Sequence, residues 1–192
     1  MKKITFKLFT LMIASMLLTS CGGEDLDDNA ISSFSDPVVT ANIEYTQLFG
    51  KWDLFQMQTE TPVDLNNDEN KSLNLLEETS CFDVMSITFN DDMTFSSINA
   101  RMDFAAGTSN NDFACMSSEG GPDTGTWEIS GDLLTLTMII DGNTFDHSKT
   151  LKFDGTSFIF EVSEYESQQY VTDPGGTAIS DVKIVSLGYT KA

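Results

Sequence analysis

The sequence GTWEISGDLLTLTMII occupies residues 125–140 and decides the fold class of this chain. In its second half, Leu134, Leu136 and Met138 alternate with Thr135 and Thr137. A period of two is typical of a strand with one buried face. Residues 130–132 read Ser-Gly-Asp and separate this strand from an apolar stretch at 126–129. The segment therefore predicts a β-hairpin.

The same period continues upstream, where Met85, Ile87 and Phe89 share one face of a strand at 84–89. After a turn at 90–92, the apolar positions change from odd to even numbers before residue 104. A change of phase inside one strand requires an extra residue, so we expect a β-bulge near residues 96–97.

About eight short strands follow one another closely along the chain, which indicates an all-β, antiparallel meander closing into a barrel or a sandwich. The predicted strands cover 51–57, 84–89, 93–104, 126–129, 134–140, 145–153, 158–162 and 178–187. Only residues 73–78 look helical, for a turn or two. Residues 165–176 predict a long loop at the mouth of the barrel, where binding residues are common.

The composition is strongly acidic, with 30 Asp and Glu against 10 Lys and Arg in 192 residues. Three of the basic residues lie in the first 20 positions, so the rest of the chain carries 30 acidic and 7 basic side chains, a net charge of −23. The electric field of so much negative charge repels the phosphate groups of nucleic acids, and we expect no nucleic-acid partner. The length suits one domain, and 40% hydrophobic residues suffice for its core.

Residues 1–20 resemble a bacterial lipoprotein signal peptide, with a basic start and an apolar run of about a dozen residues that is too short to span a bilayer. The run ends in Leu-Thr-Ser-Cys at 18–21, which is similar to a lipobox. This resemblance implies cleavage before Cys21 and attachment to a lipid bilayer through acyl chains on that residue. The alternative is an ordinary signal peptide followed by a chance cysteine.

Residues 21–46 predict an acidic tether that begins Cys-Gly-Gly-Glu-Asp-Leu-Asp-Asp and lacks sustained periodicity. The acidic run is similar to the export tag that sends some Gram-negative lipoproteins to the outer leaflet. It implies an outer-membrane protein on the cell surface. A plain solvated spacer and a periplasm-facing orientation are the alternatives.

Residues 47–192 resemble a lipocalin-like domain. The stretch LFGKWDL at 48–54 is similar to the opening L-x-G-x-W-x-L of that family, and residues 125–136 resemble the G-T-W-x-I…L-x-L segment of lipocalin-like lipoproteins in Gram-negative bacteria. The resemblance implies a lipocalin-like β-barrel and, by analogy only, a carrier of hydrophobic ligands.

Two cysteines remain once Cys21 is lipidated, and both lie where that group commonly places a pair. A disulfide between Cys81 and Cys115 would close a loop of about 35 residues, worth roughly 4 kcal/mol in the chain-entropy model. A free nucleophile is the alternative, but it needs a base and the chain has one His.

In the strand predicted at 145–153, the apolar residues have odd numbers. His147 and Lys149 also have odd numbers, so they lie on the same face. One interpretation is that they anchor an anionic head group at the polar end of an apolar pocket. The alternative is that the strand bends away there and leaves both side chains in water.

Oxygen-bearing side chains at alternate positions in 64–72 suggest a calcium loop, because several oxygens must converge on one hard cation. The candidate ligands are Asp64, Asn66, Asp68, Asn70 and Ser72. The match to an EF-hand-type loop is incomplete, since Glu69 stands in place of glycine and Leu75 in place of the bidentate acid. A polar surface loop is the alternative.

Two classes of function follow, both without catalysis, because no nucleophile–base pair stands out. The first is a carrier of a small hydrophobic or amphipathic ligand, with no cofactor. Its expected pocket is lined by Trp52, Leu54, Trp127, Leu136, Met138, Phe158 and Phe160, with His147 or Lys149 at the polar end. The second is an interaction module with a filled core that contacts a protein or glycan and binds Ca²⁺. A cavity of ~300 Å³ or more would favour the carrier.

Overall fold

A computed structural model describes residues 42–104, 113–117, 121–172 and 182–192. The predicted signal peptide and residues 21–41 of the predicted tether lie outside this part. The last tether residues belong to the fold, since the Ile43 side chain is buried and its N–H donates to the Gly131 carbonyl at 2.8 Å. No helix among the described residues is long and apolar enough to cross a membrane.

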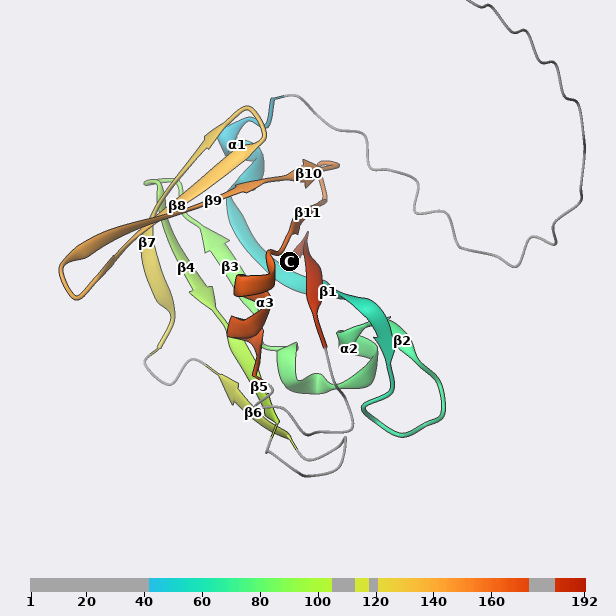
Figure 1. Cartoon of the computed structure of the whole chain (residues 1–192). Helices are drawn as coiled ribbons and strands as arrows, with labels where there is room; N and C mark the ends of the chain where they lie inside the picture. The colour runs from blue at the N-terminus through green and yellow to red at the C-terminus, as the bar shows by residue number, and fades with distance from the viewer. Residues whose placement is uncertain (1–41, 105–112, 118–120, 173–181) are drawn as a thin grey trace, which may run out of the picture. The chain divides into compact units, whose positions relative to one another are not determined.

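The described strands form one large antiparallel sheet whose strand order is β10-β11-β13-β1-β3-β4-β7-β8-β9, with β2 paired to β1 (Figure 1). Their bounds are β1 Gly50–Val63, β2 Ser72–Asn74, β3 Ser86–Phe89, β4 Thr94–Ile98, β7 Asp123–Ser130, β8 Leu133–Ile140, β9 Asn143–Thr150, β10 Lys152–Phe153, β11 Ser157–Glu161 and β13 Ile184–Lys191. This antiparallel sheet confirms the predicted fold class.

The large sheet curls into a half-barrel because its two edge strands, β9 and β10, follow each other directly along the chain. Strand β9 pairs with β8, and β10, which follows after Leu151, pairs with β11. The Leu151 N–H donates to the Asp132 carbonyl at 2.8 Å and fixes this junction. Above it, the Lys149 ammonium donates to the Glu161 carbonyl of β11 at 2.9 Å.

A smaller sheet and four short helices complete the described fold. Strands β5 (Ala100–Phe104), β6 (Phe113–Ser117) and β12 (Val171–Thr172) are ordered β12-β5-β6, with β12 parallel to β5. The helices are α1 (Tyr45–Leu48), α2 (Leu75–Glu78), the 3₁₀ turn η1 (Ser80–Phe82) and α3 (Glu164–Tyr170).

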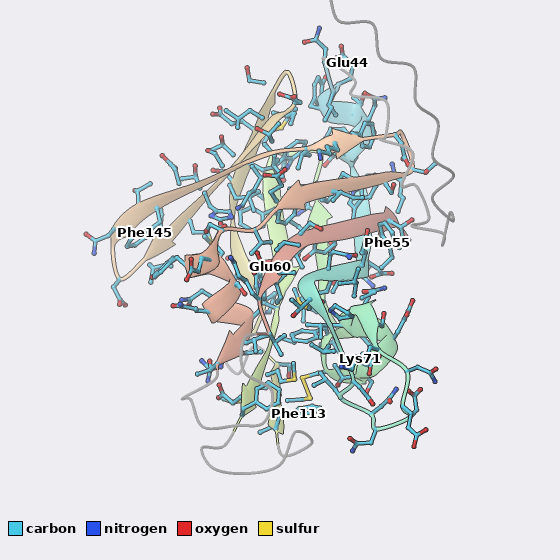
Figure 2. All side chains as sticks on the ribbon, turned by 45° about the vertical axis from the view of Figure 1, so that its right-hand side comes forward. Glu44, Phe55, Glu60, Lys71, Phe113 and Phe145 are labelled. Carbon is cyan, nitrogen blue, oxygen red and sulfur yellow. A yellow bond between two sulfur atoms is a disulfide. The ribbon has the colours of Figure 1, made fainter. Side chains whose placement is uncertain are left out.

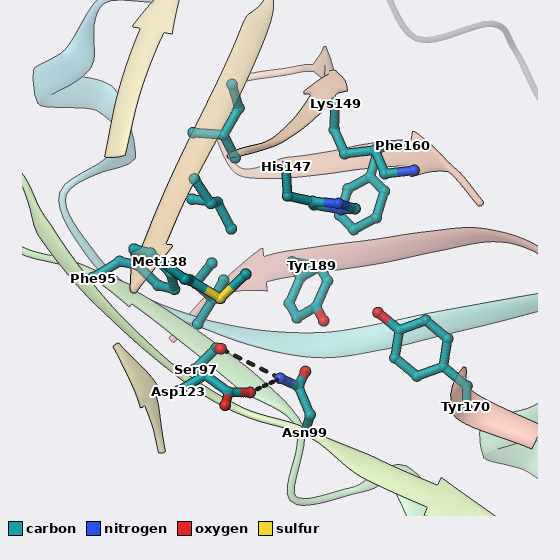
Figure 3. A pocket seen from close by; sticks show the side chains of 13 residues that line it. Phe95, Ser97, Asn99, Asp123, Met138, His147, Lys149, Phe160, Tyr170 and Tyr189 are labelled. Carbon is teal, nitrogen blue, oxygen red and sulfur yellow. Dashed lines mark hydrogen bonds between the residues drawn. The ribbon is translucent and has the colours of Figure 1, made fainter. Parts of the chain in front are cut away.

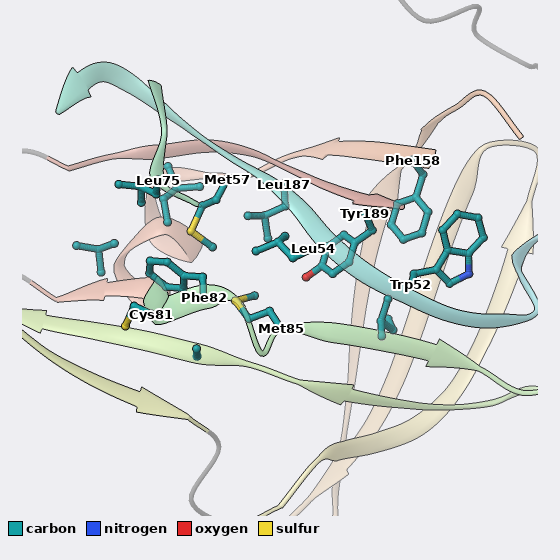
Figure 4. Packing of buried hydrophobic residues seen from close by; sticks show 14 of the residues in the cluster. Trp52, Leu54, Met57, Leu75, Cys81, Phe82, Met85, Phe158, Leu187 and Tyr189 are labelled. Atoms are coloured by element: carbon teal, nitrogen blue, oxygen red, sulfur yellow. The ribbon is translucent and has the colours of Figure 1, made fainter. Parts of the chain in front are cut away.

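The motif at 48–54 builds the centre of the core (Figure 4). Gly50 has φ +109°, a conformation that favours glycine, and it turns the chain from α1 into β1. Trp52 is fully buried, and its indole N–H donates to the Leu48 carbonyl at 2.7 Å. Its ring centre lies 5.0 Å from that of Phe158. These contacts explain the spacing of Leu48, Gly50 and Trp52 in the motif.

The predicted hairpin at 125–140 is confirmed as β7 and β8, joined at Gly131 with φ +66°. Gly125 allows a close approach between strands, since a Cβ there would collide with the Thr137 carbonyl oxygen and lie 2.9 Å from the Phe95 ring. Trp127 is buried, with its ring centre 4.9 Å from that of Phe89.

The predicted bulge near 96–97 is wrong. Strands β3 and β4 pair in unbroken register from Phe89–Phe95 to Ser86–Ile98. The apolar phase changes at Asn99 instead, because the chain leaves the large sheet there and enters the small one as β5.

Two further predictions need correction. Residues 164–170 form helix α3 rather than a loop, because Ser163 and Glu166 make a capping box. The last strand is Ile184–Lys191 rather than 178–187, and residues 178–181 lie outside the described part. It runs on past Gly188, where a Cβ would lie only 2.9 Å from the Phe55 ring of β1.

Candidate functional site

A pocket of about 210 Å³ lies inside the curl of the large sheet (Figure 3). Seven strands of the sheet, β3, β4, β7, β8, β9, β11 and β13, and the end of α3 contribute to its wall. The lining residues are Ile87, Phe95, Ser97, Asn99, Asp123, Leu134, Leu136, Met138, His147, Lys149, Phe160, Tyr170 and Tyr189. The pocket is therefore an interior site of the half-barrel, with a mainly apolar wall.

Strand β8 supplies the longest apolar part of this wall through its period-two pattern. Leu134, Leu136 and Met138 lie on one face, and their partners on β9 are Lys149, His147 and Phe145. Residues opposite each other in an antiparallel pair share a face, so His147 and Lys149 point the same way as the leucines.

The apolar face of β8 and β9 continues beyond the pocket to the end of the hairpin. Ile140 and Phe145 lie on it and are 52% and 49% exposed, and Figure 2 shows Phe145 near the hairpin tip. Ile139, on the other face of β8, is 73% exposed.

Aromatic rings form the opposite side of the pocket. The Phe160 and Tyr189 rings are nearly parallel, at 13°, with their centres 6.1 Å apart. The Lys149 ammonium lies 5.7 Å from the centre of the Phe160 ring. The Tyr170 ring joins them from the C-terminal end of α3.

The two tyrosines are neutral hydrogen-bond donors. Burial, and then the charges of Glu166 and Asp123, raise the pKa of Tyr170 to about 12. Burial also raises the pKa of Tyr189, and the neighbouring Tyr170 adds to that shift. Within the described part of the chain, neither hydroxyl makes a hydrogen bond.

A polar cluster of His147, Lys149 and Glu166 lies at the edge of the pocket. The Glu166 Oε2 atom lies 2.6 Å from the Lys149 Nζ and accepts hydrogen bonds from the Ser163 N–H and hydroxyl at 2.7 Å each. The Glu166 Oε1 atom lies 3.3 Å from the His147 Nε2. The carboxylate thus ties helix α3 to strand β9.

Burial and the neighbouring groups shift the pKa values of this cluster in opposite directions. Burial acts to raise the pKa of Glu166, but hydrogen bonds from Lys149 and Ser163 outweigh it and lower that pKa to about 2. Burial lowers the pKa of His147, Lys149 lowers it further, and Glu166 acts in the opposite direction. At neutral pH the cluster therefore holds a cation, an anion and an uncharged imidazole.

A second polar group lies on the wall formed by β4 and β7. The Asn99 amide donates to Asp123 Oδ2 at 2.8 Å and to the Ser97 hydroxyl at 3.4 Å. With Glu166, Asp123 makes two carboxylates near the pocket against one ammonium, that of Lys149.

The Glu166→Gln variant is expected to lower the free energy of unfolding at pH 7 by about 1–2 kcal/mol, because Lys149 loses a charged hydrogen-bond partner in a mostly buried place. Since the pKa of Glu166 falls from its usual 4.5 to about 2 on folding, its contribution is complete above pH 4.5 and lost as the pH falls through 2. Urea denaturation between pH 7 and pH 2 should therefore show a smaller acid-induced loss in the variant. Glu164→Gln, an exposed neighbour on α3, is the control, and equal pH profiles for both variants would contradict this assignment.

The structure divides the residues predicted for the pocket into two groups. Leu136, Met138, Phe160, His147 and Lys149 line it. Trp52, Leu54, Trp127 and Phe158 do not, because they are buried deeper in the core. The Lys149 side chain is only 15% exposed and that of His147 42%, so the strand does not leave both in water.

Glu166 and Tyr170 lie in the stretch at 165–176 that was predicted as a loop at the barrel mouth, but neither was given a role, and Tyr189 was not predicted at all. A signal for the first two was present, since Ser163 and Glu166 have the S-x-x-E spacing of a capping box and so predict a helix at 164–170. Tyr189 lies beyond residue 187, where the predicted last strand ends.

The disulfide between Cys81 and Cys115 is confirmed, with the Cα atoms 5.3 Å apart (Figure 2). It joins η1 to β6, on the far side of β5 in the small sheet. Cys21, the predicted lipidation site, lies outside the described residues.

Of the predicted calcium ligands, Asp64, Asn66, Asp68 and Asn70 lie in the connection between β1 and β2, and Ser72 begins β2. Asn66 and Asp68 accept hydrogen bonds from the N–H groups of Asp68 and Asn70, and Ser72 donates to Glu77. Asp64 has one buried oxygen without a partner. In the part of the chain that the structure describes, no group of three His, Cys, Asp or Glu side chains is placed to hold a metal ion. Calcium binding stays a prediction.

The comparison with known protein families gives one match. The family model described as a lipocalin-like domain matches residues 48–160. This range contains the opening motif at 48–54, the hairpin of β7 and β8, and most of the pocket wall. No curated protein and no solved structure matches the chain.

Proposed function

The chain belongs to the lipocalin-like domain family, and on this premise we propose that it binds a small apolar or amphipathic molecule in the pocket of the half-barrel. The observation that carries the proposal is the pocket itself, an apolar wall with a few inward polar groups, which is the usual character of ligand sites. No catalytic group enters the proposal.

The size of the pocket limits the ligand. Its 210 Å³ is less than the ~300 Å³ that we expected of a carrier. The difference arises because Trp52, Phe89 and Phe158 fill the deeper part of the half-barrel. The proposal is therefore restricted to a compact ligand, or to one end of a longer molecule.

Attachment to a membrane is part of the same proposal and rests on sequence alone. The apolar run before Cys21 and the acidic residues after it support a lipid-anchored protein on the surface of a Gram-negative outer membrane. This would place the pocket outside the cell, joined to the membrane by the predicted tether.

Native mass spectrometry of the full chain, purified in detergent from a bacterial envelope, tests the proposal. We expect a bound mass of small-molecule size that is lost on denaturation, while the denatured chain shows the mass of acyl chains on Cys21. In Met138→Trp, an indole fills the pocket, and the fraction of the chain that carries the bound mass should fall at least tenfold. Ile139→Trp is the matched control, because this neighbour on β8 is exposed and should leave binding unchanged.

A second candidate, an interaction module, is favoured by the exposed apolar end of the β8–β9 hairpin. Ile139, Ile140 and Phe145 expose apolar surface there, and such patches commonly mark contact sites for other molecules. In the same experiment, the absence of a bound small molecule together with a retained macromolecular partner would favour this candidate and contradict the first.

A further inference from the structure

The pocket has the size of a substituted benzene ring. A cavity of about 150 Å³ lined by aliphatic and aromatic side chains holds benzene in a well-studied engineered protein. The pocket here measures about 210 Å³, which leaves room for a ring with one short substituent. A long acyl chain would have to extend beyond this space.

Its walls favour an aromatic ligand. Four lining side chains are aromatic, namely Phe95, Phe160, Tyr170 and Tyr189, and Figure 3 shows three of these rings on one side of the space. The Phe160 and Tyr189 rings stack on each other at 13°. Ring faces held in this way offer offset-stacked and edge-to-face contacts to a further ring.

The charges around the pocket disfavour an anionic ligand. The Lys149 ammonium is held by Glu166 at 2.6 Å and by the Glu161 carbonyl at 2.9 Å, so it has little capacity left for a second carboxylate. Asp123 and Glu166 would repel an anion, and the chain as a whole carries −20. The interpretation of Lys149 and His147 as an anchor for an anionic head group therefore has no support in this geometry.

A cationic ligand meets the opposite difficulty. The aromatic face that would attract it is already occupied by Lys149, whose ammonium lies 5.7 Å from the centre of the Phe160 ring. A second cation on that face would lie close to the first.

On the aromatic side of the pocket, the polar groups that face a ligand are the hydroxyls of Tyr170 and Tyr189. Both keep their protons at neutral pH and lack hydrogen-bond partners among the described residues. In Figure 3 both hydroxyls point into the space between the two rings. A ligand oxygen that accepts from these hydroxyls gains hydrogen bonds that a hydrocarbon of the same shape cannot make, and this difference gives selectivity.

We propose that the pocket selects an uncharged, compact aromatic molecule with one oxygen that accepts hydrogen bonds from the hydroxyls of Tyr170 and Tyr189. This inference rests on the proposed function and names the chemical class of its ligand. The aromatic part lies against Phe160 and Tyr189, and the oxygen lies toward α3.

Four probes of similar size test the selectivity, namely acetophenone, ethylbenzene, benzoate and benzylamine. Their binding to residues 21–192 with Cys21→Ser, which has no acyl chain, is measured by isothermal titration at pH 7. We expect acetophenone to bind at least tenfold more tightly than benzoate and benzylamine. Equal or tighter binding of either charged probe would overturn the inference.

The double variant Tyr170→Phe/Tyr189→Phe separates hydrogen bonding from burial. We expect it to weaken acetophenone binding about tenfold, and to leave ethylbenzene binding within twofold or stronger. Tyr165→Phe, whose side chain is 74% exposed on the same helix, is the control, and a melting curve checks the fold of each variant. An equal loss for both probes, or no loss for acetophenone, would overturn the inference while the proposed function stands. Failure of all four probes to bind would also overturn the inference, while the bound mass in the native spectrum tests the proposed function separately.

Discussion

Replacing Trp52 by alanine is expected to lower the free energy of unfolding by about 4 kcal/mol, the largest effect of any single substitution considered. The side chain is fully buried, and its ring centre lies 5.0 Å from that of Phe158 and 6.2 Å from that of Phe153. Removing it leaves a large cavity and deprives the Leu48 carbonyl of its donor. Domains of this size are stable by only about 5–15 kcal/mol, so the variant should lose a large part of its stability.

Urea denaturation monitored by circular dichroism measures this loss. Tyr165→Ala removes an aromatic side chain that is 74% exposed, and it should change the free energy of unfolding by less than about 0.5 kcal/mol. A loss below about 1.5 kcal/mol for Trp52→Ala would mean that the centre of the core is not built around this residue.

Removing the disulfide is expected to cost about 4 kcal/mol. The bond between Cys81 and Cys115 has a sequence separation of 34, and a loop of this length restricts the unfolded chain by roughly that amount. The bond also holds β6, an edge strand of the small sheet, close to η1.

The variant Cys81→Ala/Cys115→Ala tests this expectation when it is compared with the wild-type chain under oxidising and reducing conditions. Reduced wild type and the variant should unfold at nearly the same urea concentration, well below that of the oxidised chain. If oxidised wild type and the variant unfold together, the disulfide contributes nothing to stability.

The large sheet was predictable because its signals are local. The period of two in β8 and the turn at Gly131 lie within a few residues of each other. The same holds for the motif around Gly50 and Trp52, where a positive φ and a hydrogen bond four residues back explain the spacing. The phase change before Ala100 was also visible. Its cause was not, because a bulge and a passage into a second sheet produce the same sequence pattern.

The pocket was only partly predictable, because parity shows which face a residue lies on but not its depth in the barrel. Met138 and Trp127 both point inward, yet the first lines the pocket and the second fills the core. Depth depends on how strongly the sheet curls, which no short stretch of sequence determines.

The polar edge of the pocket could not be assigned from one strand. Lys149 alone suggests an anion site, whereas the structure pairs it with Glu166, 17 residues away on α3. The capping box indicates that the helix exists, but its position across β9 is a tertiary contact. This contact is the reason why we propose an uncharged ligand and not one whose anionic head group is anchored by Lys149.

The most direct test of the central claim, that the pocket holds a compact ligand, is to map a bound probe by nuclear magnetic resonance. Residues 21–192 with Cys21→Ser and ¹³C-labelled methyl groups are titrated with acetophenone. We expect intermolecular Overhauser effects from the probe to the methyl groups of Leu136 and Met138, and none to Ile139 on the other face of β8. Contacts confined to Ile139 and Ile140, or no contact at saturating probe, would contradict the account.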